Sequence, residues 1–192
     1  MSSMKILVIE TSSEQALLAV VEEGRCVAEL PLAGGPELSA SLASHVKKLI
    51  CPPPYDRIVL GIGPGSYTGI RVGAALAQAL AFGWNVPLYT ACSLAAFATD
   101  QTGAVVIDAR SGGFYIQIGS ALPQLVPPSE AAALLRGIPL IASPHPARLQ
   151  KRLPGLAALE TRPNPLLLIE QATLQAGPLE LLYLRTDRKS VV

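Results

Sequence analysis

The chain has 192 residues, of which 50% are hydrophobic and only 15% are charged. This length and composition are typical of a globular protein with a genuine core, and they exclude a disordered chain. The formal net charge is +1, with 15 Lys and Arg against 14 Asp and Glu, so no broad positive field is available to hold a nucleic-acid backbone. The low share of charged residues predicts some apolar surface that a partner covers.

The cysteines and the amino terminus indicate a cytoplasmic protein. Cys26, Cys51 and Cys92 are widely separated and form no Cys-x-x-Cys pair, which predicts free thiols rather than a zinc or redox site. The amino terminus leads directly into an apolar strand, without the long apolar region of a signal peptide. The apolar run 72–82 contains Gln78 and is far shorter than the roughly 20 residues that span a bilayer, so we expect no membrane contact.

The first half of the chain alternates strand and helix patterns. Apolar runs and 3.6-residue spacing predict strands at 5–9, 16–21 and 24–30, a helix at 38–50, a buried strand at 58–60, a helix at 68–84, a strand at 86–89 and a short helix from Ser93. The prolines at 52–54 stop the first helix, because proline lacks an amide donor. Three strands, helix, strand, helix, strand and helix is the order of a ribonuclease H-like unit.

The second half repeats this order in a shorter form. We predict a hairpin from 104–107 and 114–118, a helix at 129–136, a strand at 139–142, a loop with short helical turns at 144–165, an amphipathic helix at 166–175 and a mobile tail at 185–189. The predicted domains are therefore an N-terminal unit, 1–102, and a shorter C-terminal unit, 103–192.

A glycine-rich segment, GIGPGSYTGIRVG at 61–73, lies between a predicted strand and a predicted helix. Glycine permits close backbone approach, and Ser66 or Thr68 can cap the helix, so the segment predicts a tight, capped turn. Phosphate binding is the alternative, because helix amino ends attract anions. The segment lacks the Gly-Lys-Ser/Thr of a Walker loop, and Ser66 stands where a dinucleotide fingerprint requires glycine. The structural interpretation is favoured.

Four segments carry a resemblance to a known family. They are IETSS at 9–13, GPGSYTGIRVG at 63–73, VIDARSGGFY at 106–115 and LLYLR at 181–185. They resemble the TsaB (YeaZ) family, a paralogue of the TsaD (Gcp/Kae-like) family. The resemblance implies an α/β fold of the actin-like or Hsp70-like ATPase superfamily, with two ribonuclease H-like subdomains of which the second is truncated.

The resemblance also implies a role in tRNA modification. In that family the chain is a non-catalytic scaffold or activator that heterodimerises with a TsaD-like catalytic subunit, and a TsaE-like ATPase joins the assembly. The complex uses ATP to transfer a threonylcarbamoyl group to the adenosine next to the anticodon, in tRNAs that read codons starting with A. We expect this chain to meet tRNA only through the complex, and a homodimer is the alternative when the partner is absent.

The residues themselves predict neither a catalytic site nor a metal site. TsaD carries a His-x-x-x-His metal motif, which places two imidazoles on one helix face, whereas the only histidines here are His45 and His145. No cofactor is therefore assigned to this chain. The rival interpretation is an autonomous ATP-dependent kinase or phosphatase of the same superfamily, which would use the acidic residues described next.

Two acidic residues, Glu10 and Asp108, each end an apolar strand where actin-like folds place acids near a nucleotide's magnesium. Glu10 with Thr11 and Ser12 forms either a remnant of such a site or a cap of the following turn, and both interpretations remain open. Asp108 is followed by Ala109 and Arg110, not by the Asp-x-Gly pattern of a phosphate loop. This departure argues against nucleotide hydrolysis.

The second predicted helix carries two rows of small residues, which let a neighbouring backbone approach closely. One row is Gly69, Gly73, Ala77 and Ala81, and the other is Ala75, Ala79 and Gly83. One row explains packing on the sheet, and the second favours contact with another subunit, as the first two helices make in the resembling family. The candidate partner interface is Leu42, Val46, Gly69, Val72, Gly73, Ala75, Leu76 and Ala79.

Overall fold

The computed structural model describes residues 4–35, 37–49, 54–99, 101 and 103–184. They divide into two compact units. Unit 1 runs to Phe97 and includes Arg162–Leu182, and unit 2 comprises Ala98–Thr161 with residues 183–184. The predicted C-terminal domain, 103–192, differs from this division because most of the chain after Thr161 returns to unit 1.

Unit 1 is built on a six-stranded sheet with the order β11-β5-β4-β1-β2-β3. Its elements are β1 (Lys5–Glu10), β2 (Gln15–Glu22), β3 (Arg25–Ala33), α1 (Leu38–Leu49), β4 (Arg57–Gly61), α2 (Tyr67–Trp84), β5 (Leu88–Ala91), the 3-10 helix η1 (Ser93–Phe97), α5 (Pro165–Glu170) and β11 (Thr173–Leu174). Strands β1, β2 and β3 are antiparallel, whereas β1, β4 and β5 are parallel. This is the strand order of a ribonuclease H-like unit, as the sequence predicts.

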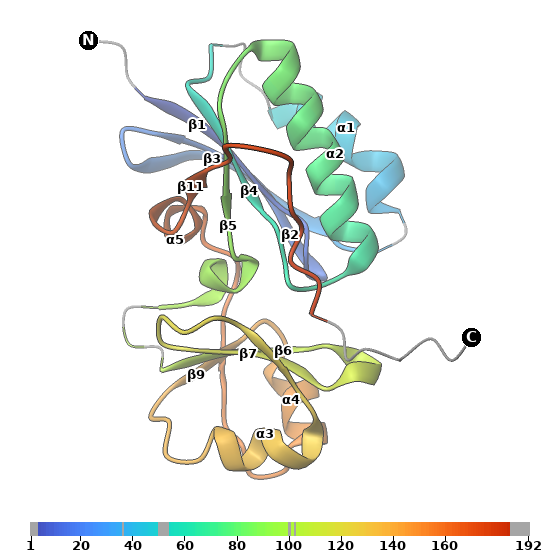
Figure 1. Ribbon diagram of the computed structural model, residues 1–192, viewed down its shortest axis with the longest axis vertical. Coiled ribbons are helices and arrows are strands. Elements are labelled where there is room, and N and C mark those ends of the chain that lie inside the picture. The colour runs from blue at the N-terminus through green and yellow to red at the C-terminus, as the bar shows by residue number, and fades with distance from the viewer. Residues whose placement is uncertain (1–3, 36, 50–53, 100, 102, 185–192) are drawn as a thin grey trace. The chain divides into compact units, whose positions relative to one another are not determined.

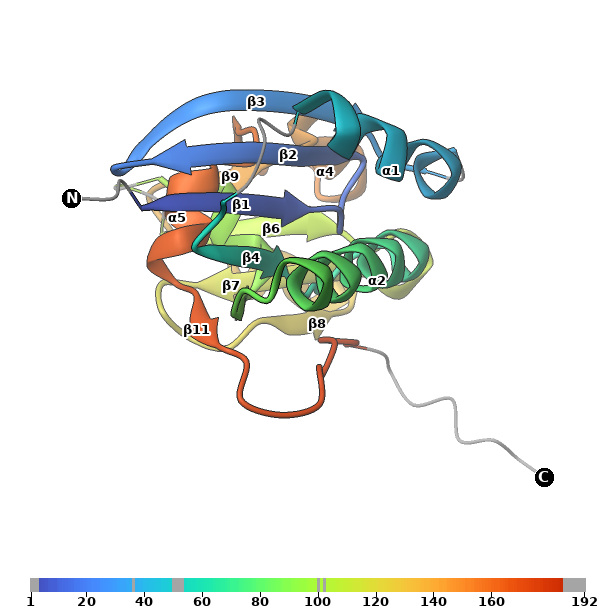
Figure 2. The same cartoon turned by 90° about the horizontal axis from the view of Figure 1, so that it is seen from above.

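The central strand β1 organises the core of unit 1, because it is apolar on both faces and covered on both. Helices α1 and α2 cover one face, and α5 lies on the other (Figures 1 and 2). On the first face Leu7 and Ile9 pack with Leu42 and Val46 of α1 and Ala77 of α2. Full burial of such side chains contributes roughly 1.5–3 kcal/mol each, so this face holds much of the stability of unit 1.

Unit 2 repeats the plan of unit 1 at smaller scale. Its elements are β6 (Ala104–Asp108), the 3-10 turn η2 (Arg110–Gly112), β7 (Phe114–Ile118), β8 (Gln124–Val126), α3 (Pro128–Leu134), β9 (Ile141–Ser143), α4 (Pro146–Arg152) and β10 (Leu159–Glu160). The order β10-β9-β6-β7-β8 matches that of unit 1, with β6 in the place of β1. Both helices pack on one face of this sheet (Figure 1). The fold is therefore the predicted one, with two ribonuclease H-like units of which the second is shortened.

The prediction of a helix at 166–175 is wrong for the second half of this range. Helix α5 ends at Glu170, and Thr173 and Leu174 pair antiparallel with Thr90 and Tyr89 of β5. Pairing with β5 outweighs the local helix preference of these residues, because it provides hydrogen bonds for backbone groups at the edge of the sheet.

Other differences are smaller. The sequence gives no signal for β8, and the predicted strands 86–89 and 139–142 lie slightly later, at β5 and β9. Helix α4 forms within the predicted loop 144–165, where Pro146 occupies a first-turn position that tolerates proline. The predicted tail, 185–189, and most of the prolines at 52–54 lie outside the described residues.

Among the helices that the structure describes, none combines the length and apolarity required to cross a bilayer.

Candidate functional site

The glycine-rich turn after β4 is tied to two other segments of unit 1 by backbone contacts. The Ser66 amide donates to the Ser12 carbonyl at 2.6 Å, and Ser93 bonds Gly63 through both its amide and its hydroxyl, at 2.8 and 2.9 Å. Ser66 is the N-cap of α2, and its hydroxyl accepts from the Gly69 amide at 3.2 Å. The turn is thus the tight, capped connection that the sequence favours, and the amides of Gly63, Ser66 and Gly69 are engaged by the protein itself.

Helix α2 approaches the turn after β1 so closely that only glycine fits at two positions. The Thr11 hydroxyl donates to the Gly69 carbonyl at 2.8 Å, and both residues are buried. A Cβ at Gly69 would collide with the Thr11 carbonyl, and one at Gly73 would collide with Thr11 Oγ1. The row of Gly69, Gly73 and Ala77 therefore faces inward.

Glu10 ends β1 with its side chain fully buried. Its Oε1 accepts from the Ser12 amide at 2.7 Å, which is the turn-capping role that the sequence left open. Within the described residues, Glu10 Oε2 and the Ser12 hydroxyl have no hydrogen-bond partner. Burial raises the pKa of Glu10, and this effect outweighs the lowering effect of the hydrogen bond from the Ser12 amide.

Asp108, the other candidate nucleotide-proximal acid, ends β6 in unit 2 and is engaged by an internal cation. Its side chain is 5% exposed and forms an ion pair with Arg152 of α4. Asp108 Oδ1 also accepts from the Arg110 amide at 2.7 Å. The same guanidinium donates to the Arg110 carbonyl at 2.6 Å and lies 4.6 Å from the centre of the Phe114 ring. Arg152 therefore pairs with the carboxylate of Asp108, which a bound metal would need as a ligand.

The candidate nucleotide-proximal residues are divided between the two units. Glu10, Thr11 and Ser12 lie together beside the glycine-rich turn of unit 1, whereas Asp108 belongs to unit 2. In the part of the chain that the structure describes, no three His, Cys, Asp or Glu side chains gather to bind a metal.

The described cysteine thiols lack the features of a catalytic nucleophile. Burial raises the pKa of Cys92 to about 11, and burial together with the nearby Glu29 raises the pKa of Cys26. Reactive thiols instead have a lowered pKa and a positive environment. Neither thiol is therefore suited to nucleophilic catalysis.

The predicted partner residues fall into three groups by exposure. Leu42, Val46, Gly69 and Gly73 are buried, and Val72 and Leu76 are half-buried against the core. Ala75 and Ala79 are exposed, as is Gly83. A partner can touch the last group directly, whereas the buried residues can act only by supporting it.

The exposed side of α2 also carries two aromatic residues that the sequence analysis did not select. Phe82 is 91% exposed and Tyr67 is 46% exposed. Arg71 stacks over the Tyr67 ring and donates to its hydroxyl at 2.6 Å. Their spacing from Ala75 and Ala79 places all five residues on one side of the helix. We call this set, Tyr67, Arg71, Ala75, Ala79 and Phe82, the outer face of α2.

We predict that Glu10→Gln stabilises the protein at neutral pH. Because the folded-state pKa of Glu10 is raised, the unfolded chain loses its proton first, so stability falls as pH rises through about 4.3 toward the folded pKa. This loss amounts to at most about 1.4 kcal/mol for each pH unit. Urea unfolding at several pH values should show a shallower dependence for Glu10→Gln. The exposed Glu37→Gln is the control, and equal slopes in the two variants would contradict the prediction.

We predict that Arg152→Met destabilises unit 2 by about 2 kcal/mol, because it leaves the buried Asp108 carboxylate without its cation. Adding Asp108→Asn to Arg152→Met should restore part of the loss, since the double variant has no unpaired charge. Hydrogen exchange of the amides in β6 and β7 measures the effect locally. Arg136→Met, at an exposed position of the same unit, should change little. An equal loss in both single variants would show that the ion pair is unimportant.

Comparison with known proteins relates the chain to one family in sequence and in fold. A family model described as TsaD, tRNA N6-adenosine threonylcarbamoyltransferase, matches residues 46–123. The proteins named tRNA threonylcarbamoyladenosine biosynthesis protein TsaB are 33% identical over 138 residues in Bacillus subtilis, 35% over 136 residues in Haemophilus influenzae and 31% over 124 residues in Escherichia coli. These matches cover 65%, 60% and 58% of this chain and 60%, 53% and 53% of the relatives. The chain thus spans little more than half the length of the relatives it matches.

Among solved structures, YeaZ from Pseudomonas aeruginosa has a TM-score of 0.67 at 23% identity, covering 88% of this chain and 90% of that one. A second structure, of an uncharacterized protein with similarity to peptidase YEAZ from Pseudomonas aeruginosa, has a TM-score of 0.65 at 21% identity, covering 93% of this chain and 100% of that one. At this identity the likeness establishes the fold. Together, the sequence matches and the shared fold support the assignment of this chain to the TsaB (YeaZ) family.

Proposed function

We propose that the chain is a non-catalytic subunit of the machinery that makes threonylcarbamoyladenosine in tRNA. It pairs through α2 with a TsaD-like catalytic subunit, and a TsaE-like ATPase and the tRNA join through that complex. The names of the bacterial relatives support the pathway. The observation that carries the mode of action is the outer face of α2, where small residues adjoin the exposed Phe82 ring.

The outer face of α2 has the physical character of a protein interface. An aromatic side chain is the commonest kind of anchor at such a surface, and small residues beside it allow a partner helix to approach closely. The Phe82 ring is almost fully exposed to water. Burying this ring against a partner supplies a driving force for association. Arg71 adds a planar donor at the edge of this surface.

The non-catalytic role is supported by the state of the acidic and histidine side chains. Glu10 is desolvated and Asp108 is paired with Arg152. His45 lies on α1 with Nδ1 2.8 Å from the Ser41 carbonyl of the preceding turn. None of these groups has the arrangement of a nucleophile with its base or of an open metal site.

We predict that Ala75→Arg or Ala79→Arg abolishes capture of the TsaD-like subunit while leaving the melting temperature nearly unchanged. Both positions are exposed, so the fold is spared. In the complex, an unpaired buried charge costs several kcal/mol, and each 1.4 kcal/mol weakens association about tenfold. Phe82→Ala should weaken capture by truncating the aromatic anchor.

The matched control is Ala132→Arg, which adds the same charge at an exposed position of α3 in unit 2. It should bind the TsaD-like subunit at full strength. If Ala75→Arg and Ala79→Arg are folded and bind as well as this control, the interface lies elsewhere.

We also predict that the chain alone transfers no threonylcarbamoyl group to tRNA, because its described residues contain no group of His, Cys, Asp or Glu side chains that could hold a metal ion. When the chain is added to a mixture of the TsaD-like subunit, the TsaE-like ATPase, ATP and the threonylcarbamoyl donor, we expect the tRNA to be modified. Mass spectrometry of nucleosides from the treated tRNA measures the product. Transfer by the chain alone would overturn the non-catalytic assignment.

A further inference from the structure

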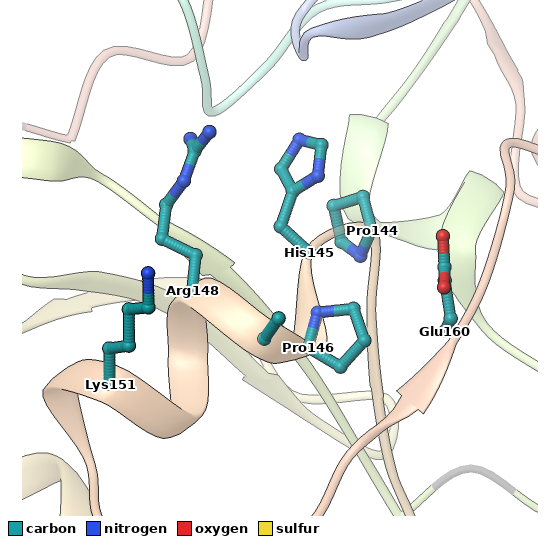
Figure 3. Close-up of a pocket in the computed structure, with 7 residues that line it drawn as sticks. Pro144, His145, Pro146, Arg148, Lys151 and Glu160 are labelled. Atoms are coloured by element: carbon teal, nitrogen blue, oxygen red, sulfur yellow. The ribbon is translucent and has the colours of Figure 1, made fainter.

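Unit 2 contains an open pocket of about 350 Å³ that the proposed function does not use. It lies between the start of α4 and strand β10, and its lining includes Pro144, His145, Pro146, Arg148, Lys151 and Glu160. Figure 3 shows Arg148 and Lys151 on one side and Glu160 on the other, with His145 between them. The volume lies at the small end of the range for small-molecule sites.

The base of this pocket is conformationally restricted. Pro144 and Pro146 flank His145, and proline fixes its own backbone torsion. The His145 amide donates to the Ser143 hydroxyl at 3.2 Å. Glu160 stands opposite Ser143 in the parallel pairing of β9 and β10. The backbone at Glu160 and at the start of α4 is therefore anchored to the same pair of strands.

The charges on the two sides select for a ligand with two different groups. Arg148 and Lys151 are three residues apart on α4, so they project from neighbouring positions of one helix face. A guanidinium fork beside an ammonium group suits a phosphate. Glu160 would repel a simple anion, but its carboxylate can accept hydrogen bonds from hydroxyl groups. Acidic residues play this part toward ribose in dinucleotide-binding folds.

We propose that this pocket binds a ribonucleotide unit, with the phosphate at Arg148 and Lys151 and a ribose hydroxyl at Glu160. The imidazole of His145 lies between these groups, where it can stack on a base or donate to the phosphate. The unit can be a free nucleotide or one nucleotide of an RNA chain. Only the RNA source rests on the proposed function, since the pocket chemistry stands by itself.

Titration of the isotopically labelled full chain, followed by NMR, tests the site directly. AMP should shift the amide signals of residues 145–151 and 160, and it should bind more tightly than dAMP or inorganic phosphate. Lys151→Gln and Arg148→Gln should each weaken AMP binding about tenfold, which corresponds to about 1.4 kcal/mol. Glu160→Gln should remove the preference for AMP over dAMP.

Arg136→Gln is the matched control, because it removes one positive charge from an exposed position of the same unit outside the pocket lining. It should leave AMP binding unchanged. Lys151 is itself exposed, so loss of binding in Lys151→Gln cannot be attributed to unfolding, and melting temperatures verify this for every variant.

A second titration, with tRNA, distinguishes a free nucleotide from a nucleotide of an RNA chain. Binding of tRNA that Lys151→Gln weakens more than Arg136→Gln, without binding of AMP, identifies the RNA source. Binding of AMP without such an effect on tRNA identifies a free nucleotide. If neither ligand shifts the pocket signals, or all variants match Arg136→Gln, the proposal is overturned. The chain is used without its partner, so failure here is independent of the capture experiments on α2.

Discussion

The close packing of α2 against the turn after β1 is the contact on which the arrangement of unit 1 depends. Gly69 and Gly73 leave room for Thr11, and the Thr11 hydroxyl binds a carbonyl of the helix. A larger residue at either glycine would push the helix away from the sheet. Because this contact fixes the rotation of α2 about its axis, it also determines which side chains face outward. Ala75 and Phe82 are at the surface as a consequence of how the glycines are buried.

The two units place an acidic residue at the same topological position but give it different surroundings. Glu10 ends the central strand of unit 1, and Asp108 ends the central strand of unit 2. Unit 1 buries its carboxyl group, which raises the pKa of Glu10. Unit 2 instead supplies Arg152, which binds both Asp108 and the carbonyl of Arg110 in the turn that follows. Unit 2 therefore stabilises the charged form of its acid, whereas unit 1 favours the neutral form.

The sequence predicts those elements of the structure that are determined by the residues within the element itself. Strand β1 and helix α2 were found because an apolar run or a helical period extends over the whole element, and the capping role of Ser66 follows from its place before the helix. Strand β11 could not be found, because Thr173 and Leu174 become a strand only beside β5. The pairing of Asp108 with Arg152 joins residues 44 positions apart, and no periodicity reports such a contact. The exposure of Phe82 likewise depends on the direction in which the glycine row faces.

The return of the chain to unit 1 after unit 2 has a consequence for synthesis on the ribosome. The sheet of unit 2 is complete once Glu160 has been made, since β10 is its last strand. Unit 1, although it begins the chain, still lacks the buried Leu168 of α5 and the edge strand β11 at that point. The usual order of co-translational folding, in which the amino-terminal domain is finished first, is therefore reversed here. A nascent chain released early would expose the apolar face of β1 that α5 covers, which makes premature termination a route to aggregation.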